Sequence, residues 1–540
     1  MSSQRLYRRT ARRVLLLVAA LALAAVPARP DEATAAPAPK PGGTLIMVIG
    51  ADPPTLNPAI TTGTPDLYTA CKIFEGLVRL DRDLEPQPVL AESWTVQPDG
   101  LTYTFALRKG VTWHDGKPFT SKDVEWTFEN VTAKFGPRTK GPFQAVKAVT
   151  TPDDHTVVLE MKEAYGPLLS LLTCSSAAIL PAHVYSNGDI LSHPRNLDPV
   201  GTGPFRFKSW ARGDHIRLER NPTYWQRGQG MPYLDEIVMK IITDPKAAAL
   251  ALEAGEVDYI PDYFVDKAEY LRLKDHEGIV GQQDTNVPTN NVLIFNVRKA
   301  PLDRAEVRRA IFHAIDRAFI VEKAQFGLGG PGKSAIDSRL GWAYDRAVDF
   351  NRLYPYDPAK ANALLDKAGL RRNAQGVRFE VTLPYESGKA DFNEEAQIIR
   401  ENLKAVGIAV DLMSLERSLM LDKVFKQWDF DLTLQRYTTS GDVAVGVQRL
   451  YVTSAIDRRP FTNPSGYSNP EVDALFEKGA KSPSPRTRAP HYHKVQEILA
   501  RDVPVIVLTE NPSVDLASTK FGGLWKGPDP YDWWEHVYQK

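Results

Sequence analysis

The arrangement of apolar and polar residues along the chain predicts a mixture of strands and helices. Apolar residues at every second position, typical of strands with one buried face, mark residues 103–107, 156–161, 377–383 and 430–434. Other segments repeat apolar residues at intervals of three and four, which is typical of helices that bury one side. The chain is therefore expected to belong to the mixed α/β class.

Several predicted helices carry recognisable start signals. Asp357 and Asn469 are each followed by proline, which gives a capping side chain and a proline at the first helical position. A third helix is predicted over residues 392–406, and the alternating run 408–412 directly after it indicates a strand. Helix followed by strand recurs between residues 300 and 435, which predicts an α/β unit in this part of the chain.

Two segments are expected to connect this unit to the rest of the chain. Residues 290–301 separate it from an earlier α/β unit, and the strand-like run 503–508 precedes a tail, 520–540, that is too short for a core of its own. The tail must pack on the earlier unit, so the chain is expected to leave one lobe, build a second and return. Two lobes joined by two crossings form a hinge architecture.

Composition places the 540-residue chain among globular proteins and narrows its partners. Hydrophobic residues make up 43% and charged residues 24%, so disorder is not expected, and the length predicts several domain-sized units. The 66 basic and 66 acidic residues balance, which argues against nucleic acid as a partner because phosphate binding needs a basic surplus. After residue 35, no apolar stretch reaches the roughly 18 residues that suggest a membrane span.

The first 35 residues have the features of an export signal peptide. An arginine-rich start precedes an apolar run at 14–26, which is too short to span a bilayer, and small residues follow it. Cleavage is expected between Ala28 and Ala38. The pair Arg12-Arg13 also resembles a twin-arginine signal, so the Sec and Tat routes both stay open. No cysteine lies near the cleavage region, so the mature protein is expected to be free in the periplasm and not a lipoprotein.

The chain contains two cysteines, Cys71 and Cys174. An oxidising periplasm would allow them to form a disulfide. Sequence gives no measure of their separation in space, and two ordinary buried thiols are the simpler expectation.

A series of short motifs runs through the chain from residue 43 to residue 470. They are Gly-Thr-Leu at 43–45, Phe-Glu-Gly-Leu-Val at 74–78, Leu-Ala-Glu-Ser-Trp at 90–94, Trp-His-Asp-Gly-Lys-Pro-Phe-Thr at 113–120, Gly-Thr-Gly-Pro-Phe at 201–205, Asn-Pro-Thr-Tyr-Trp at 221–225 and Gly-Tyr-Ser-Asn-Pro at 466–470. In this order they resemble the family 5 extracellular solute-binding proteins of ABC importers, which include dipeptide-, oligopeptide- and nickel-binding proteins. We interpret the motif at Trp113 and His114 as structural, and expect Gly201 and Gly203 to give the backbone freedom where a strand starts.

The resemblance implies an α/β, two-lobed periplasmic binding protein fold, hinged at two crossings, with an extra subdomain in the first lobe. Lobe I would comprise residues 36–288 with the subdomain inserted at about 86–198, lobe II residues 289–505, and residues 506–540 would return to lobe I. It also implies a receptor, not an enzyme, that captures a peptide or another polar or anionic solute and delivers it to ABC permease subunits in the inner membrane. The oligomeric state stays open, with a monomer as the default expectation. An exported enzyme acting on an envelope or carbohydrate substrate is the alternative.

Segments that suggest other chemistry lack the context that this chemistry requires. Residues 327–334 match the phosphate-binding pattern G-x-x-x-x-G-K-S, but a helical pattern precedes them and none follows, so a glycine-rich connection is expected. His491 and His493 would point to different faces of a helix, so no metal site is predicted. No cofactor is expected, and the hydrolase patterns G-x-S-x-G and H-E-x-x-H do not occur.

Candidate ligand contacts follow from the resemblance. The family's peptide binders carry Trp-x-x-Asp after the strand that corresponds to 430–434, and the acid holds the peptide's amino terminus. Arg436 and Thr439 occupy those two positions here and Asp442 lies three residues later, so recognition of a free peptide is in doubt, because a buried ammonium needs a carboxylate. Arg417 lies near another pocket position. Arg417 and Arg436 together would suit the binding of a carboxylate, a phosphate or a sugar acid. The alternative, to which we give equal weight, is that both are ordinary surface arginines.

The other candidates are polar or aromatic residues at positions where that family lines its pocket. They are Thr62 and Thr64 in a lobe I loop, Asn290 and Asn291 on the crossing segment, Trp342 and Tyr437 as rings that would stack on a ligand or fill the core, and Glu510 just past the returning strand.

Overall fold

The computed structural model describes residues 39–284, 287–527 and 530–540. The predicted export signal, residues 1–35, lies outside this part of the chain. Three large hydrophobic cores form within the described residues, and each lies against its own β-sheet. Among these residues, no helix has both the length and the apolar character that a membrane span requires.

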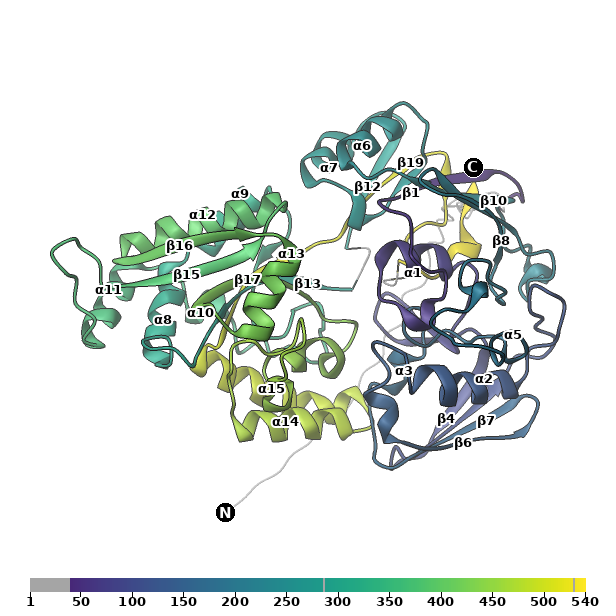
Figure 1. The fold of residues 1–540 in the computed structure, drawn as a ribbon, viewed down its shortest axis with the longest axis horizontal. Helices are drawn as coiled ribbons and strands as arrows, with labels where there is room; N and C mark the ends of the chain where they lie inside the picture. The colour runs from purple at the N-terminus through teal and green to yellow at the C-terminus, as the bar shows by residue number, and fades with distance from the viewer. Residues whose placement is uncertain (1–38, 285–286, 528–529) are drawn as a thin grey trace, which may run out of the picture. The chain divides into compact units, whose positions relative to one another are not determined.

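The first sheet has seven strands. In sheet order they are β12 (Ile279–Gln283), β19 (Val514–Ser518), β11 (Tyr259–Ile260), β1 (Thr44–Ile49), β10 (Glu236–Ile241), β9 (His215–Arg220) and β8 (Phe205–Ala211). β1 pairs in parallel with β10 and β11, whereas β19 is antiparallel to both of its neighbours. Because β19 comes from the C-terminal part of the chain, the chain returns to this sheet after building the others (Figure 1). Helices α1 (Thr64–Ala70), α6 (Pro245–Glu253) and α7 (Lys267–Leu273) contribute buried residues to its core.

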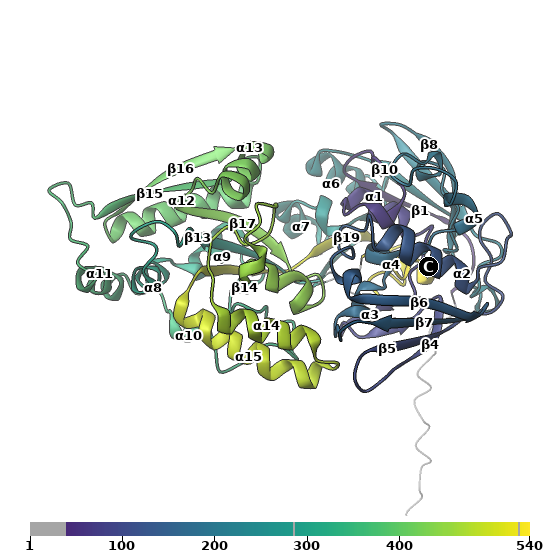
Figure 2. The same cartoon turned by 60° about the horizontal axis from the view of Figure 1, so that its bottom comes forward.

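A four-stranded antiparallel sheet carries the second core (Figure 2). Its order is β4 (Ala91–Val96), β5 (Thr102–Leu107), β7 (Thr156–Met161) and β6 (Val146–Asp153). β5 and β7 confirm the strands predicted at 103–107 and 156–161. Gly100, between β4 and β5, has φ +69°, the left-handed conformation that this tight turn requires. Helix α2 (Ser121–Thr127) packs nearby, and Trp113 is fully buried in this core.

The third core surrounds a sheet that combines residues from distant parts of the chain. Its order is β14 (Gly330–Pro331), β18 (Val505–Asn511), β13 (Thr289–Phe295) and β17 (Leu432–Thr438). Strands β15 (Phe379–Glu386) and β16 (Ile408–Leu415) form a separate parallel pair joined by helix α12 (Ala390–Ala405), which confirms the predicted α/β unit. β17 begins two residues later than the predicted 430–434, because Phe430 packs in a small separate cluster with Met420, Val424 and Phe425.

The predicted helix starts are confirmed. The side chain of Asp357 caps α11 (Pro358–Lys367), and that of Asn469 caps α14 (Pro470–Lys481). The other described elements are α3 (Leu168–Leu171), α4 (Cys174–Ala177), α5 (Ala182–Tyr185), α8 (Ala305–Ala314), α9 (Arg317–Ala324), α10 (Phe350–Leu353), α13 (Arg417–Leu421), α15 (Pro485–Asp502), β2 (Val78–Leu80), β3 (Pro86–Pro88), β20 (Phe521–Gly522), β21 (Tyr538–Gln539) and short 3₁₀ and π segments.

The chain passes between the first and third sheets twice. β12 of the first sheet is followed by β13 of the third, and β18 of the third is followed by β19 of the first. Only Pro512 and Ser513 separate β18 from β19. Both crossings expected from the sequence are therefore present, whereas the residue numbers at which the chain divides into lobes stay predictions.

Cys71 and Cys174 form a disulfide, with their Cα atoms 5.8 Å apart. The expectation of two separate thiols was wrong. The two residues lie 103 positions apart in the chain, so no local pattern in the sequence reports their contact.

The role expected for Gly201 and Gly203 also needs correction. Neither glycine has a positive φ. Instead, a Cβ on Gly201 would lie 1.9 Å from the carbonyl oxygen of Ile73, and one on Gly203 would lie 2.7 Å from the same oxygen. These glycines therefore allow two backbone segments to approach closely, and conformational freedom is not the reason for them.

His114 forms hydrogen bonds to the backbone of both Gly201 and Gly203. The backbone N–H of Gly201 donates to Nδ1 of His114 (3.2 Å), so Nε2 carries the proton that it donates to the carbonyl of Gly203 (3.0 Å). Burial lowers the pKa of His114 to about 4, because it disfavours the charged imidazolium. These contacts support the structural interpretation of this motif.

The glycine-rich segment 327–334 forms a connection, as predicted. Residues Gly330–Pro331 pair with β18, and Oγ of Ser334 donates to Gln496 in the buried core (2.8 Å). The next helix, α10, begins only at Phe350. The segment therefore lacks the helix N-terminus that a phosphate-binding loop requires.

Candidate functional site

A cavity of about 250 Å³ lies where the two crossings meet the first core. Thr64 and Tyr68 of α1 line one part of it, and Thr289 of β13 and Thr438 of β17 line another. Ser513, in the two-residue link between β18 and β19, also lines it. The cavity is therefore bounded by elements of both the first and the third sheet regions.

The lining of this cavity is rich in hydroxyl groups. Ten of its residues are serine or threonine: Thr62, Thr64, Ser170, Thr173, Ser175, Ser176, Thr289, Thr438, Ser440 and Ser513. Three tyrosines, Tyr68, Tyr263 and Tyr531, add rings, and Arg138 and Asp262 are the charged residues of the described lining. Leu80, Leu171, Val287, Val445 and Pro530 complete the lining, so hydrogen-bonding groups are set among apolar and aromatic walls, which suits a small solute that carries polar groups.

The disulfide fixes two walls of the cavity relative to each other. Cys71 directly follows α1, which carries Thr64 and Tyr68. Cys174 begins α4, which carries Ser175 and Ser176. The covalent bond between Cys71 and Cys174 therefore links the two helices that present these four residues.

Two of the residues predicted from the sequence, Thr62 and Thr64, line this cavity. Thr439 lies between the lining residues Thr438 and Ser440 but is itself buried, and its Oγ1 has no hydrogen-bond partner among the described residues.

The predicted arginines each face a carboxylate. Arg436 forms an ion pair with Asp391, and its Nε donates to Oδ1 of Asn291 (2.9 Å). Arg417 is paired with Glu386 at 2.8 Å. Neither arginine lines the cavity. No local pattern signals these pairs, because Asp391 and Glu386 lie 45 and 31 residues from their partners.

Asn291 sits at the centre of a buried polar network. Its Nδ2 donates to Glu395 (2.8 Å) and Asp391 (3.2 Å), and its Oδ1 accepts from Asn511 (2.9 Å) as well as from Arg436. Burial raises the pKa of Glu395 to about 7, and the nearby Asp391 charge acts in the same direction. Asn290, the neighbouring candidate, is also buried.

The remaining candidates have internal partners and do not line the cavity. Asp442 is paired with Arg488, and the ring of Trp342 lies 4.8 Å from the Arg488 guanidinium. The hydroxyl of Tyr437 donates to the carbonyl of Thr462 (3.0 Å). Glu510 accepts a hydrogen bond from Oγ of Ser338 (2.6 Å).

Sequence reasoning missed most of the residues that line the cavity. Arg138, Ser175 and Tyr263 lie in short helices and loops where no periodic pattern distinguishes them from other polar surface residues. The nearest signal was the cysteine at 174, since a disulfide there would have placed α4 beside α1.

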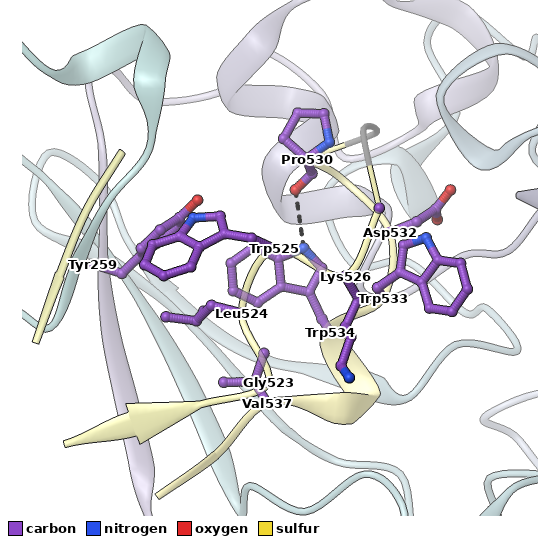
Figure 3. Close-up of a pocket in the computed structure, with 11 residues that line it drawn as sticks. Tyr259, Gly523, Leu524, Trp525, Lys526, Pro530, Asp532, Trp533, Trp534 and Val537 are labelled. Carbon is purple, nitrogen blue, oxygen red and sulfur yellow. Dashed lines mark hydrogen bonds between the residues drawn. The ribbon is translucent and has the colours of Figure 1, made fainter. Parts of the chain in front are cut away.

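A second, much smaller cavity lies beneath the C-terminal segment (Figure 3). It is lined by Tyr259, Trp525 and Trp534 among others, and Nε1 of Trp534 donates to the carbonyl of Pro530 (3.1 Å). Its volume of about 20 Å³ holds little more than one water molecule, so it is too small for a solute. Within the described residues, no group of three or more His, Cys, Asp or Glu side chains is arranged to hold a metal ion.

Comparison with known proteins identifies the class to which this architecture belongs. The family described as bacterial extracellular solute-binding proteins, family 5, matches residues 85–457. The chain belongs to this family. Its mixed α/β structure with two crossings is the two-lobed fold of periplasmic binding proteins, and it is an extracellular solute-binding protein.

Three relatives show how far the similarity extends. The oligopeptide-binding protein AppA of Bacillus subtilis (strain 168) is 29% identical over 487 residues, which cover 87% of this chain and 86% of AppA. The structure of the substrate-binding protein CtaP from Listeria monocytogenes has a TM-score of 0.80 at 24% identity, covering 93% of this chain and 100% of CtaP. The structure of the PBP AgaA in complex with agropinic acid, from A. tumefaciens R10, has a TM-score of 0.75 at 26% identity, covering 92% and 99%.

Proposed function

We propose that this protein is a free periplasmic receptor that binds a small polar solute in the 250 Å³ cavity and delivers it to the permease of an ABC importer. One observation carries the proposal: the cavity is lined by residues from both sides of the two crossings, including Thr64, Thr438 and Ser513. A solute bound there contacts both lobes at once.

This arrangement explains how binding would favour a closed form. A solute gains the full set of hydrogen bonds only when both lobes contact it, so it binds the closed form more tightly than the open one. That difference in affinity shifts the population towards closure. The permease then recognises the joint surface that closure creates. The protein makes and breaks no covalent bond in this cycle, and the solute leaves it unchanged.

The export signal and the disulfide support the proposed location. Residues 1–35 have the pattern of a cleaved signal peptide, and the Cys71–Cys174 disulfide suits an oxidising compartment. The proposal includes the division into lobe I at 36–288, lobe II at 289–505 and a return at 506–540, and a monomeric state. The related AppA is named as an oligopeptide-binding protein, and the structure of AgaA is described in complex with agropinic acid. A peptide and an organic acid are therefore both candidate solutes.

The cavity assignment is tested by filling the cavity. Thr438→Trp places a large ring in it, and Thr95→Trp places the same ring on an exposed position of β4 as a control. Native mass spectrometry of the purified mature protein, before and after exposure to periplasmic extract, should show a bound small molecule in the wild type and the control. Thr438→Trp should not show it. Equal capture by all three proteins, or release of a chemically altered solute, would contradict the proposal.

A further inference from the structure

Among the described residues, Arg138 is the only positively charged side chain that lines the main cavity. Its Nη1 donates to the carbonyl oxygen of Ser175 (2.8 Å), and no carboxylate within the described ranges is paired with it. A guanidinium has five N–H donors. One is used here, so the others are available to a solute in the cavity.

Arg449 lies behind the opposite part of the cavity wall. Its Nε donates to the carbonyl of Gly446 (3.1 Å), and its Nη2 lies 3.5 Å from the carbonyl of Thr438, a lining residue. No described carboxylate is paired with Arg449 either. Burial lowers its pKa, the nearby Tyr437 opposes this effect, and the positive charge of Arg138 lowers it further. The charge of Arg138 therefore acts at Arg449 as well as in the cavity.

Other arginines of the chain differ from this half-buried pair. Arg436 and Arg488 each face an acid, Asp391 and Asp442. Arg308 lacks such an acid but donates to several backbone carbonyls, which use most of its N–H groups. Arg138 is half-buried and, among the described residues, donates to a single carbonyl and faces no paired acid.

The carboxylates near the cavity have partners of their own. Asp262 lines the cavity, but its Oδ1 accepts a hydrogen bond from the backbone N–H of Val514 (2.8 Å). Burial lowers the pKa of Lys267, and the negative charge of Asp262 offsets part of this lowering. Asp66, beside the lining residue Thr64, accepts a hydrogen bond from Thr61. Among the described residues, neither carboxylate is paired with Arg138 or Arg449, so both guanidiniums can act on a negatively charged solute.

We propose, on the basis of the function proposed above, that the cavity binds a hydroxylated organic anion of the sugar-acid type, whose acidic group is held by Arg138 and further attracted by Arg449. The carboxylate would accept bidentate hydrogen bonds from the Arg138 fork. The ten serine and threonine hydroxyls suit the hydroxyls of such a solute. Tyr68 adds a donor, because it lines the cavity and its buried hydroxyl has no hydrogen-bond partner among the described residues.

The test compares anions with neutral counterparts of the same shape. The mature protein is titrated by isothermal calorimetry with D-gluconate, D-glucuronate and D-galacturonate, with sorbitol, glucose and galactose as neutral counterparts, and with trialanine. We expect at least one sugar acid to bind about tenfold or more tightly than its neutral counterpart, which is the size of effect expected of a charge-assisted pair. Its affinity should also fall as salt is raised.

Variants locate the effect. Arg138→Gln should weaken binding of that sugar acid about tenfold, Arg138→Lys should weaken it less because the charge is kept, and Arg449→Gln should weaken it about threefold. Arg417→Gln serves as the matched control, since this exposed arginine already faces Glu386 and does not line the cavity. It should change the affinity less than about twofold. Thermal unfolding of each variant shows whether it folds.

Three results would overturn the inference while leaving the proposed function intact. These are equal affinity for a sugar acid and its neutral counterpart, unchanged affinity in folded Arg138→Gln, and binding of trialanine or a neutral sugar in place of every acid. If none of the probes binds, the inference fails, and the solute seen by native mass spectrometry decides separately whether the proposed function stands.

Discussion

Nη2 of Arg488 lies 2.6 Å from Oδ1 of Asp442, and Nη1 lies 2.7 Å from Oδ2, so the two side chains form a bidentate pair that is almost sealed from solvent. The Arg488 Nε also donates to the carbonyl of Gly479 (2.9 Å). Asp442 in turn caps the start of the following π segment through the N–H of Ala444 (2.8 Å). Asp442, a candidate ligand contact in the sequence, is therefore part of the protein interior.

Removing one partner of this pair should destabilise the protein strongly. Asp442→Asn leaves the Arg488 charge buried without its counter-ion, so the free energy of unfolding should fall by about 3–5 kcal/mol. Chemical denaturation measures the change. Glu497→Gln, which removes an exposed pair with Lys494, should cost less than about 1 kcal/mol. Comparable losses in the two variants would contradict the assignment of Asp442 to the core.

Loss of the disulfide should reduce both stability and solute binding. The bond closes a loop of about 100 residues, for which chain-entropy arguments give about 4–5 kcal/mol of stabilisation. The Cys71→Ser/Cys174→Ser protein should therefore unfold at lower denaturant, and reduction of the wild type should produce the same shift. Solute affinity should fall as well, because α1 and α4 both line the cavity. A reductant should have no further effect on the double variant.

His114 should make the protein lose stability in mild acid. Its pKa is about 4 in the folded protein and about 6.5 in an unfolded chain, so between these values the unfolded state binds more protons. The contribution of His114 is complete above pH 6.5 and is lost as the pH falls to 4, by up to about 3 kcal/mol. His114→Gln should flatten the unfolding free energy over this range. An unchanged pH profile would show that the imidazole is not held neutral by the fold.

Glu75 should act in the opposite sense. Burial raises its pKa to about 7, while Tyr224 and Trp225 donate to its Oε1 at 2.9 and 3.0 Å. The folded protein then binds more protons than the unfolded chain between pH 4.5 and 7, so this contribution is complete below pH 4.5 and is lost as the pH rises through 7. Glu75→Gln keeps an acceptor for both donors and should be more stable than the wild type at pH 8. At pH 4.5 the two proteins should be alike.

The close approach at Gly203 gives a test that does not involve charge. Gly203→Ala would place its methyl 2.7 Å from the backbone of Ile73, and overpacking of this kind costs about 1–3 kcal/mol. Gly228→Ala is the control, since a methyl group there would meet no atom within 4 Å and the φ of Gly228 is not positive. The melting temperatures of the two variants should differ by about 1–3 °C if the chain unfolds as one unit. Equal melting temperatures would mean that the segment moves aside at little cost.

The features predicted well from the sequence are those that depend on neighbouring residues. Asp357 and Asn469 cap helices because each side chain reaches the backbone a few residues later. β7 coincides with its predicted range because its alternation is local. The family motifs identified the protein family because residues in them, such as Trp113 and His114, have structural roles in the fold.

Most residues of the candidate solute site could not be predicted, because their positions depend on contacts between residues that lie far apart in the chain. From the sequence, Arg436 was expected to be able to bind a solute, but in the structure it is paired with Asp391. Arg138 lies in no recognisable sequence motif. Pairing of Cys71 with Cys174, which would have placed α4 beside α1, likewise needed the tertiary structure. Long-range charge pairing therefore decides which arginines can serve a solute, and only the folded chain shows it.

The two-residue link between β18 and β19 has a consequence for movement. Pro512 has a nearly fixed φ, so a swing of one lobe against the other must be absorbed on this strand largely by the backbone torsions of Ser513 and its immediate neighbours. Ser513 also lines the candidate solute cavity. Ser513 therefore belongs both to the link between the two sheets and to the lining of the cavity. A larger or smaller solute bound there would change the backbone torsions of this link, and with them the angle between the two lobes in the closed form.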